Sequence, residues 1–381
     1  MEWKEVLLSE FLEFNPKRTI KKNEVARKIT MDLLIPHSKQ IYSFKYEPYT
    51  GGAKFSNGDT IMARITPCLE NGKHAYVSCL NEGEIAYGST EYIVLCGKNG
   101  VSDNEFVYYL SHTPQFVNTA IKSMVGSSGR QRAQVPVLEN LIMPVPVNLF
   151  DQRKIVGILS ALDSKIENNN KINANLEAQA EALFKSWFVD FTPFKDQPFV
   201  DSELGPIPQG WKVGKLGDIC TFKRGKNLLS KNAIDEGVPV VAGGLSPSCY
   251  HNQANTSAPV VTVSGSGANA GFMRMYHVDV WASDCSFIDV SCDYLYFVYC
   301  FLSVNRRLLK HAQTGAVQPH VKPADIHDFD VVIPEEDIVK AFQSIIKELL
   351  TKVGVNEKEN QRLAALRDTL LPKLMSGEIK L

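Results

Sequence analysis

The sequence predicts an α+β protein with a pseudo-twofold internal repeat, in which two mixed α/β domains are joined by two long helices that form a coiled coil. Two observations indicate the repeat. Segments with a seven-residue apolar period lie 187 positions apart, so that Ile155 corresponds to Phe342. A Trp-Lys segment opens each half, with Trp3 in "MEWKEVLLSEF" and Trp211 in "GPIPQGWKVGKLGDI". The same order of patterns therefore runs twice along the chain.

The first mixed domain is expected at residues 1–149. Its strand-like runs include Thr60–Thr66 and Tyr92–Cys96, separated by turns rich in Gly, Asn and Ser. An apolar helical stretch follows at Asn104–Ile121, then a glycine-bearing polar loop at Gly126–Val135, and finally the apolar strand "LIMPVP". This order predicts a domain of mixed helix and sheet.

A first spacer helix is expected at residues 150–189. At 1.5 Å per residue, about 38 helical residues extend about 57 Å. The Asn-rich run at 167–171 is a poor helix former and favours a kink, but the heptad phase continues through it, and we expect one helix. The heptad positions are apolar with one exception: Ile155, Leu162, Asn169, Leu176 and Leu183.

A proline-rich linker at residues 190–210 cannot continue the helix. The second mixed domain, expected at 211–335, then repeats the patterns of the first. It has a strand-like run at Pro259–Ser264, an apolar helical stretch at Asp293–Lys310, a polar loop at Gln313–Val321 and the apolar strand "FDVVIP". We therefore expect a second domain built like the first.

A second spacer helix is expected at residues 336–381, continuous through Gly354. One polar residue at a coiled-coil core position fixes register at a cost in stability. Because Asn169 and Asn356 share a heptad position, we expect the helices to pack together with these residues setting the register; the alternative is two unrelated amphipathic helices, each on its own domain. The matching heptad positions are Phe342, Leu349, Asn356, Leu363 and Leu370, and a second seam matches Ile158, Leu159 and Ile166 with Ile345, Ile346 and Val353.

Composition favours a cytoplasmic protein without a membrane span or metal site. The net charge is −1, so any basic surface for nucleic acid must be local. The sequence has no run of eighteen apolar residues and no signal-peptide pattern. The eight cysteines form no C-x-x-C pair, which favours free reduced thiols over structural zinc.

Motifs typical of enzymes are absent from the sequence. There is no P-loop, the eight histidines show no metal spacing, and the glycine run at 265–271 has the spacing of a β-turn rather than of a dinucleotide loop. Asp59, Glu70 and Lys73 are interpreted as solvated surface rather than a nuclease cluster. The sequence therefore predicts a binding protein with two unlike domains on a rigid spacer.

Three segments resemble those shared by the specificity (S) subunits of type I restriction–modification systems. These segments are "LDSKIENNNKINANLEAQAEALFKSWFVDF", "SELGPIPQGWKVGKLGDI" and "LRDTLLPKLMSGEI". The resemblance covers essentially the whole chain, and the tandem duplication is also the organisation of that family. The two mixed domains are similar to its target recognition domains.

The resemblance implies a non-catalytic DNA-binding subunit. Each recognition domain would read one half of a bipartite site in double-stranded DNA, and the helices, as an antiparallel coiled coil, would set the gap. Two modification (methyltransferase) subunits would bring S-adenosylmethionine, and restriction (translocase/nuclease) subunits would bring ATP and Mg, so no cofactor is expected on this chain. The alternatives are the specificity chain of a type IIB-like enzyme, a self-contained enzyme and a coiled-coil scaffold.

Candidate DNA contacts are donors near small residues that let backbone approach phosphate, or Arg, Asn and Gln suited to base edges. The alternatives are ordinary loops, turn-forming side chains and solvated charge; for Arg130, phosphate and base contact both stay open. In the glycine-bearing loops the candidates are Ser128, Arg130, Gln131, Arg132, Thr314 (before Gly315), Gln318 and His320. In turns they are Arg64, Asn71, Lys73, His74, Ser264, Ser266, Asn269 and Arg274. After each Trp-Lys segment they are Lys17, Arg18, Lys21, Lys22, Lys223, Arg224 and Lys226.

One further expectation is implied by the resemblance and another follows from the repeat. The outer faces of the helices are the expected docking surface for the modification subunits, and Trp187 and Phe188 either join that surface or pack in the core. Pseudo-twofold symmetry also places the end of the second helix beside the start of the chain. The segment Ser376–Leu381 is therefore expected near Trp3.

Overall fold

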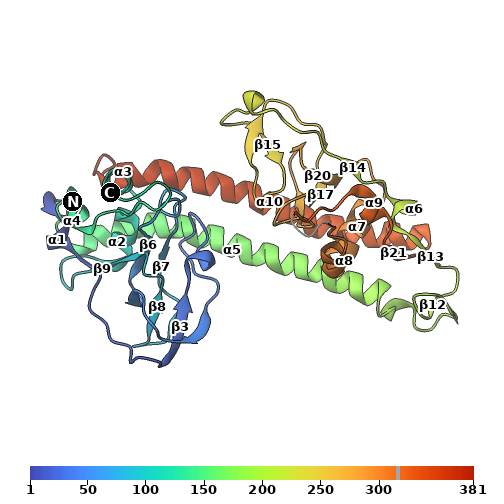
Figure 1. Ribbon diagram of the computed structural model, residues 1–381, viewed down its shortest axis with the longest axis horizontal. Helices are drawn as coiled ribbons and strands as arrows, with labels where there is room; N and C mark the ends of the chain where they lie inside the picture. Colours follow the sequence, from blue (N-terminus) through green and yellow to red (C-terminus); the bar gives the residue numbers. More distant parts are fainter. Residues whose placement is uncertain (315–317) are drawn as a thin grey trace. The chain divides into compact units, whose positions relative to one another are not determined.

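A computed structural model describes residues 1–314 and 318–381, which form two compact units. Unit 1 comprises Met1–Glu167 and Asn360–Leu381, and unit 2 comprises Asn168–Glu359. Both long helices contribute to both units (Figure 1).

The two long helices are continuous. Helix α5 spans Leu149–Phe188 and helix α10 spans Glu336–Met375, with 40 residues each. Neither the Asn-rich run of α5 nor Gly354 of α10 interrupts the helix. Gly354 instead allows close packing within unit 2, because a Cβ atom there would lie 2.6 Å from the Cβ atom of His277.

Unit 1 contains two four-stranded sheets and one strand pair. The first sheet has the order β2-β9-β6-β7 and is antiparallel throughout, and the second has the order β4-β3-β8-β5 with β3 and β8 parallel. The pair joins β1 to β10. The strands are β1 (Trp3–Leu7), β2 (Leu12–Phe14), β3 (Val25–Ile29), β4 (Lys45–Pro48), β5 (Lys54–Ser56), β6 (Thr60–Ala63), β7 (His74–Tyr76), β8 (Ile85–Gly88), β9 (Tyr92–Gly97) and β10 (Ile142–Pro146).

Unit 1 also contains short helices, of which α1 and α2 contact the β2-β9-β6-β7 sheet. The apolar stretch expected at Asn104–Ile121 is two helices rather than one, because Thr113 caps the second and Pro114 occupies its first turn. Asp103 caps the first helix by accepting from two backbone amides. The helices are α1 (Leu8–Phe11), the 3₁₀ turn η1 (Met31–Leu33), α2 (Asn104–Leu110), α3 (Pro114–Lys122) and α4 (Val135–Glu139).

Unit 2 repeats this topology. Its four-stranded sheet has the order β14-β20-β17-β18, and a three-stranded sheet has the order β16-β15-β19 with β15 and β19 parallel. The strand pairs are β13–β21 and β11–β12. The strands are β11 (Phe199–Val200), β12 (Ile207–Pro208), β13 (Lys212–Lys215), β14 (Lys223–Arg224), β15 (Val238–Val241), β16 (Cys249–His251), β17 (Val260–Ser264), β18 (Met273–Tyr276), β19 (Trp281–Ala282), β20 (Cys285–Ile288) and β21 (Asp330–Ile333).

The helices of unit 2 follow the same order as those of unit 1. They are η2 (Thr192–Phe194), α6 (Leu216–Ile219), η3 (Ser230–Asn232), α7 (Leu295–Val304), α8 (Arg306–His311) and α9 (Pro323–His327). Strand β1 and helix α1 match β13 and α6, and α4 with β10 matches α9 with β21. The internal repeat is therefore a repeat of topology.

The long helices pair in opposite directions within each unit. In unit 1, Arg367 of α10 contacts Asp163 of α5; in unit 2, Glu359 contacts Asn169, and Asn356 contacts Asn173. Residue numbers thus fall along α10 as they rise along α5. The antiparallel coiled coil is confirmed, with one correction: Ile345, expected in the second seam, is 41% exposed.

The end of helix α5 lies in the aromatic core of unit 2. Phe188 is buried and its ring centroid lies 4.8 Å from that of Phe342 and 5.8 Å from that of Trp211. Trp187 packs against Phe194 and Phe342. Of the two roles weighed for Trp187 and Phe188, packing is the one that the structure shows.

The chain termini meet within unit 1, as the repeat predicts (Figure 1). Gly377 has a positive φ of 76°, and a Cβ atom there would lie 2.8 Å from Cε2 of Trp3. Ile379 and Trp3 pack against the same hydrophobic core. The segment after α10 therefore lies beside the first strand.

Candidate nucleic-acid interface

In unit 1, the backbone joins the glycine-bearing loop to the turn after β6. The amide of Ala133 donates to the carbonyl of Arg64 (2.8 Å), and the amide of Thr66 donates to the carbonyl of Gln131 (3.0 Å). Arg132 forms β-bridges with Ile65 and with Val125. The bonds place Arg64, Gln131 and Arg132 together at the end of β6.

A carboxylate fixes the guanidinium of Arg132 in this group. Its Nε atom donates to both oxygens of Glu91 (3.0 and 2.9 Å), and Nη2 donates to Oε1 (2.7 Å). The bond from Arg132 lowers the pKa of Glu91 and raises that of Arg132. Glu91 directly precedes β9, and the arginine is held in one plane while its side chain stays 42% exposed.

Unit 2 repeats the joint between loop and turn bond by bond. The amide of Val321 donates to the carbonyl of Gly265 (3.1 Å), and the amide of Gly267 donates to the carbonyl of Pro319 (3.1 Å). His320 bridges to Ser266 and Thr314, just as Arg132 bridges to Ile65 and Val125. His320 and Ser266 therefore occupy positions equivalent to those of Arg132 and Ile65.

A carboxylate stands at the equivalent position in unit 2. Asp284 directly precedes β20, and its carbonyl accepts from the amide of Gly265 (3.0 Å), as that of Glu91 accepts from Arg64 (2.9 Å). Its side chain accepts hydrogen bonds from Arg224 and from the Ser266 hydroxyl. The turn residue Asn269 is held nearby by its bond to the carbonyl of Gly243 (3.3 Å).

Several other candidates lie at the surface. Ser128 and Arg130 are exposed at the tip of the unit 1 loop, and Asn71 is exposed in the turn between β6 and β7. Thr314 and Gln318 are exposed on either side of residues 315–317, so the predicted Gly315 lies outside the described residues. The exposed lysines are Lys17, Lys21, Lys22, Lys223 and Lys226.

Two predicted contacts are wrong because the side chains are buried. His74 is 1% exposed, and its ring lies 4.7 Å from that of His112. Burial lowers the pKa of His74, so this ring is neutral at pH 7. Ser264 is 3% exposed in β17. Neither side chain is presented to DNA.

Three further candidates are engaged by their own unit. Arg274 lies 3.6 Å from Glu357 of α10 and stacks over Tyr276, so the structure places it against the helix rather than among the loops. Lys73 donates to the carbonyl of Met31 (2.8 Å). Arg18 forms two bonds with Asp59, which is 0% exposed, and thereby compensates a buried carboxylate.

The two predicted register asparagines are buried in the helix seam of unit 2. Asn169 and Asn356 are 1% and 2% exposed. Asn169 donates to Glu359 (2.8 Å), and Asn356 donates to Asn173 (2.8 Å), so each bonds to the opposite helix. Their role in fixing register stays a prediction.

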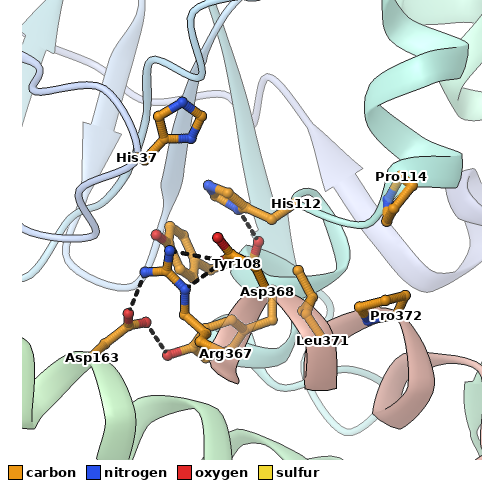
Figure 2. Close-up of a pocket in the computed structure, with 10 residues that line it drawn as sticks. His37, Tyr108, His112, Pro114, Asp163, Arg367, Asp368, Leu371 and Pro372 are labelled. Carbon is orange, nitrogen blue, oxygen red and sulfur yellow. Dashed lines mark hydrogen bonds and ion pairs between the residues drawn. The ribbon is translucent and has the colours of Figure 1, made fainter. Parts of the chain in front are cut away.

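Unit 1 also contains a polar cavity of about 230 Å³ between helices α2, α5 and α10. Figure 2 shows Arg367 directed at Asp163, with His112 and Tyr108 on the adjoining wall. Asp163 accepts from Arg367 (2.7 Å) and from the Tyr109 hydroxyl (2.6 Å). Unit 2 lacks an ion pair at the equivalent positions, where the buried Leu350 corresponds to Asp163 and the buried Ala180 corresponds to Arg367.

Sequence reasoning missed Glu91 and Asp284. Each carboxylate directly precedes a strand of the four-stranded sheet, and aligning the two halves strand by strand would have placed them together. Within the described residues, no group of three or more His, Cys, Asp or Glu side chains is placed to hold a metal. No helix in that part of the chain is long and apolar enough to cross a membrane.

The chain is similar to known specificity subunits. The family described as "Type I restriction modification DNA specificity domain" matches residues 1–178 and 208–367. The type I restriction enzyme MjaIX specificity subunit of Methanocaldococcus jannaschii is 31% identical over 307 residues, covering 74% of this chain and 70% of that protein. The HindI specificity subunit of Haemophilus influenzae is 23% identical over 429 residues, covering 89% and 90%. The S subunit from M. genitalium shares the fold, with a TM-score of 0.55 at 19% identity over 98% of this chain and 96% of that chain.

Proposed function

Because this chain belongs to the family of type I restriction–modification specificity subunits, we propose that each of its two units reads one half of a bipartite site in double-stranded DNA. The reading surface of each unit is the joint between the glycine-bearing loop and the turn after the central strand. In unit 1 it presents Gln131 and Arg132, and the exposed Arg130 at the loop tip would contact phosphate. In unit 2 it presents Arg224, Ser266 and His320.

The repeated joint is the observation that supports this proposal most strongly. The same pair of backbone bonds holds loop to turn in both units, while the side chains at equivalent positions differ, as Arg132 and His320 do. A constant backbone with variable donors is what reading two different half-sites requires, because bases are distinguished by the side chains that reach them. In unit 2, the exposed Lys223 and Lys226 flank Arg224 and would supply phosphate contacts.

The long helices are proposed to set the gap between the half-sites. A 40-residue helix is about 60 Å long, which exceeds one turn of DNA at about 34 Å. The helices pair antiparallel within each unit, and the buried asparagines of the unit 2 seam would fix their register. Helix length would then determine the spacing more than any loop does.

The chain is proposed to be non-catalytic and to act with partner subunits. Modification subunits would dock on the outer faces of the helices and supply S-adenosylmethionine chemistry, and restriction subunits would supply ATP-driven cleavage. Most of the α5 surface between Lys165 and Lys185 is polar and partly exposed, as a docking face requires. The cytoplasm is the expected location, as it is where the DNA lies.

Methylation mapping tests the proposal. The chain is produced with its modification subunits in a host lacking other methyltransferases, and the genome is sequenced for modified adenines. We expect one bipartite motif with a fixed gap. Replacing Gln131 and Arg132 together by alanine should relax or abolish only one half of that motif. A continuous motif, or one unaltered by this variant, would contradict the proposal.

A further inference from the structure

The structure assigns Glu91 and Asp284 as positioning residues that hold DNA-reading arginines in place and so determine sequence discrimination, one in each unit. This inference rests on the proposed function, because it concerns how the loop–turn joints read DNA. It adds two acidic residues to a surface that basic and polar residues were expected to form. Neither carboxylate would itself contact DNA.

Glu91 and Asp284 occupy equivalent positions in the two units. Both residues directly precede the strand that pairs with the central strand of the four-stranded sheet. The backbone carbonyl of each accepts from the first residue after that central strand, Arg64 or Gly265. The carboxylates therefore occupy one position in the repeated topology, although the sheets have different sequences.

The arginines that bind the two carboxylates come from different parts of the fold. Arg132 reaches Glu91 from the glycine-bearing loop, whereas Arg224 reaches Asp284 from strand β14. Arg224 lies flat on Gly265, where a Cβ atom would be 2.3 Å from its Nη1 atom. Because arginines from two different elements bind equivalent carboxylates, we infer that a carboxylate at this position serves to fix a guanidinium.

The ion pair leaves part of the Arg132 guanidinium available to bind DNA. Arg132 uses its Nε atom and one Nη2 hydrogen on Glu91 and one Nη1 hydrogen on the carbonyl of Arg130 (3.4 Å). One hydrogen on each of Nη1 and Nη2 then has no acceptor among the described residues. Two such hydrogens on one planar group match the paired acceptors of a guanine edge.

Stability alone is a poor explanation for these pairs. The side chains of Arg132 and Glu91 are 42% and 23% exposed, and those of Arg224 and Asp284 are 45% and 29% exposed. Ion pairs with this degree of exposure contribute little to folding. A carboxylate behind a reading arginine has another effect: it offsets the charge that attracts phosphates of any sequence and leaves the directional hydrogen bonds.

The test compares four variants in the complex with the modification subunits. The variants are Glu91→Gln, Asp284→Asn, Arg132→Ala and Arg224→Ala. Affinity is measured over a salt series for duplexes carrying the mapped motif intact, with the first half scrambled, or with the second half scrambled. The matched control is Glu47→Gln, which removes a carboxylate of unit 1 that pairs with Lys28 (2.7 Å) on the other sheet.

We expect each carboxylate variant to lower discrimination at one half-site only, by at least about fivefold. Glu91→Gln should act on the half read by unit 1 and Asp284→Asn on the other half. Affinity for scrambled DNA should rise, with a steeper salt dependence, because the arginine charge is no longer offset by a carboxylate and can pair with phosphate. Glu47→Gln should change none of these quantities.

Three results would overturn the inference in distinguishable ways. If the arginine variants lower discrimination but the carboxylate variants behave like Glu47→Gln, the arginines read DNA without positioning, and the proposed function stands. If the arginine variants also leave discrimination unchanged, the joints do not read DNA, and both proposals fail. A loss at both half-sites from either carboxylate variant would indicate a purely structural role and would also overturn the inference.

Discussion

The buried ion pair between Asp163 and Arg367 allows a sharp test of how unit 1 is held together. The side chains are 9% and 15% exposed, and Asp163 also accepts from the Tyr109 hydroxyl. Replacing Arg367 with methionine would leave the carboxylate in the cavity wall of Figure 2 with that one bond. Breaking a buried pair from one side typically costs 3–5 kcal/mol. Because some solvent reaches this pair, we expect about 3 kcal/mol.

The reverse single change should cost less. In Asp163→Leu, Arg367 keeps its contact with Asp368 (2.9 Å), which is largely exposed and lets the charge reach water. We expect a loss of about 1–2 kcal/mol. In unit 2 the equivalent positions are occupied by the buried apolar residues Leu350 and Ala180, so the repeated fold accommodates apolar side chains there.

The double variant Asp163→Leu/Arg367→Met should therefore be more stable than Arg367→Met alone. We expect it within about 1–2 kcal/mol of the wild type, since the Tyr109 hydroxyl still loses its acceptor. Urea unfolding, monitored by hydrogen exchange of unit 1 amides, gives the changes in unfolding free energy of the two single variants and of the double variant, which complete a double-mutant cycle. A control is Arg306→Ala, whose exposed pair with Glu181 should contribute less than about 1 kcal/mol. Additive single losses would refute the reasoning.

Three further predictions concern acid, the helix seam and the loop tip. Burial lowers the pKa of His74 and lowers that of His112 to about 4, so the unfolded chain binds more protons than the folded one below about pH 6.5. The stability of unit 1 should thus fall as the pH drops from about 6.5 towards 4, by about 1.4 kcal/mol per pH unit for each ring once the pH is well below 6.5. Thermal unfolding of the wild type and of His112→Gln at pH 7 and pH 5 measures this loss of stability. Equal losses in the two proteins would contradict the prediction. Asn356→Leu should raise the free energy of unfolding by up to roughly 1 kcal/mol, and with it the urea midpoint, because an apolar residue replaces a buried amide in the seam. A large loss of stability would show that the amide stabilises the helices. Arg130→Ala should weaken binding to all sequences alike and lower the salt slope by about one, because no described residue holds this exposed side chain in place; a change confined to one motif base would show base reading instead.

The elements that the sequence predicted well are those with a long or strong local pattern. An apolar repeat over about five heptads predicted both long helices and their shared asparagines, and apolar runs predicted the strands at Tyr92–Gly97 and Val260–Ser264. The second sheet of unit 1 was not predicted, because strands such as Lys54–Ser56 are too short for a periodicity to show. The misplaced Ile345 lies one position from the buried Ile346, and the heptad alone does not separate neighbours at the edge of a seam.

The site was harder to predict because its groups come from distant parts of the chain. Glu91 and Arg132 are 41 residues apart, and only the folded sheet brings them together. The loops were found because glycines next to donors are visible locally. His74 was misassigned because a histidine in a short strand has the same sequence signature whether its ring faces solvent or, as here, another buried ring.

The spacing of the two half-sites is the most direct test of whether the long helices set the gap. Deleting seven residues from each helix at positions 187 apart preserves the heptad phase and shortens each helix by about 10 Å. Methylome sequencing of a host producing this variant with its modification subunits reports the motif. Our account predicts the same two half-sites separated by a gap that is shorter by up to about three base pairs. Unchanged half-sites with an unchanged gap would contradict it.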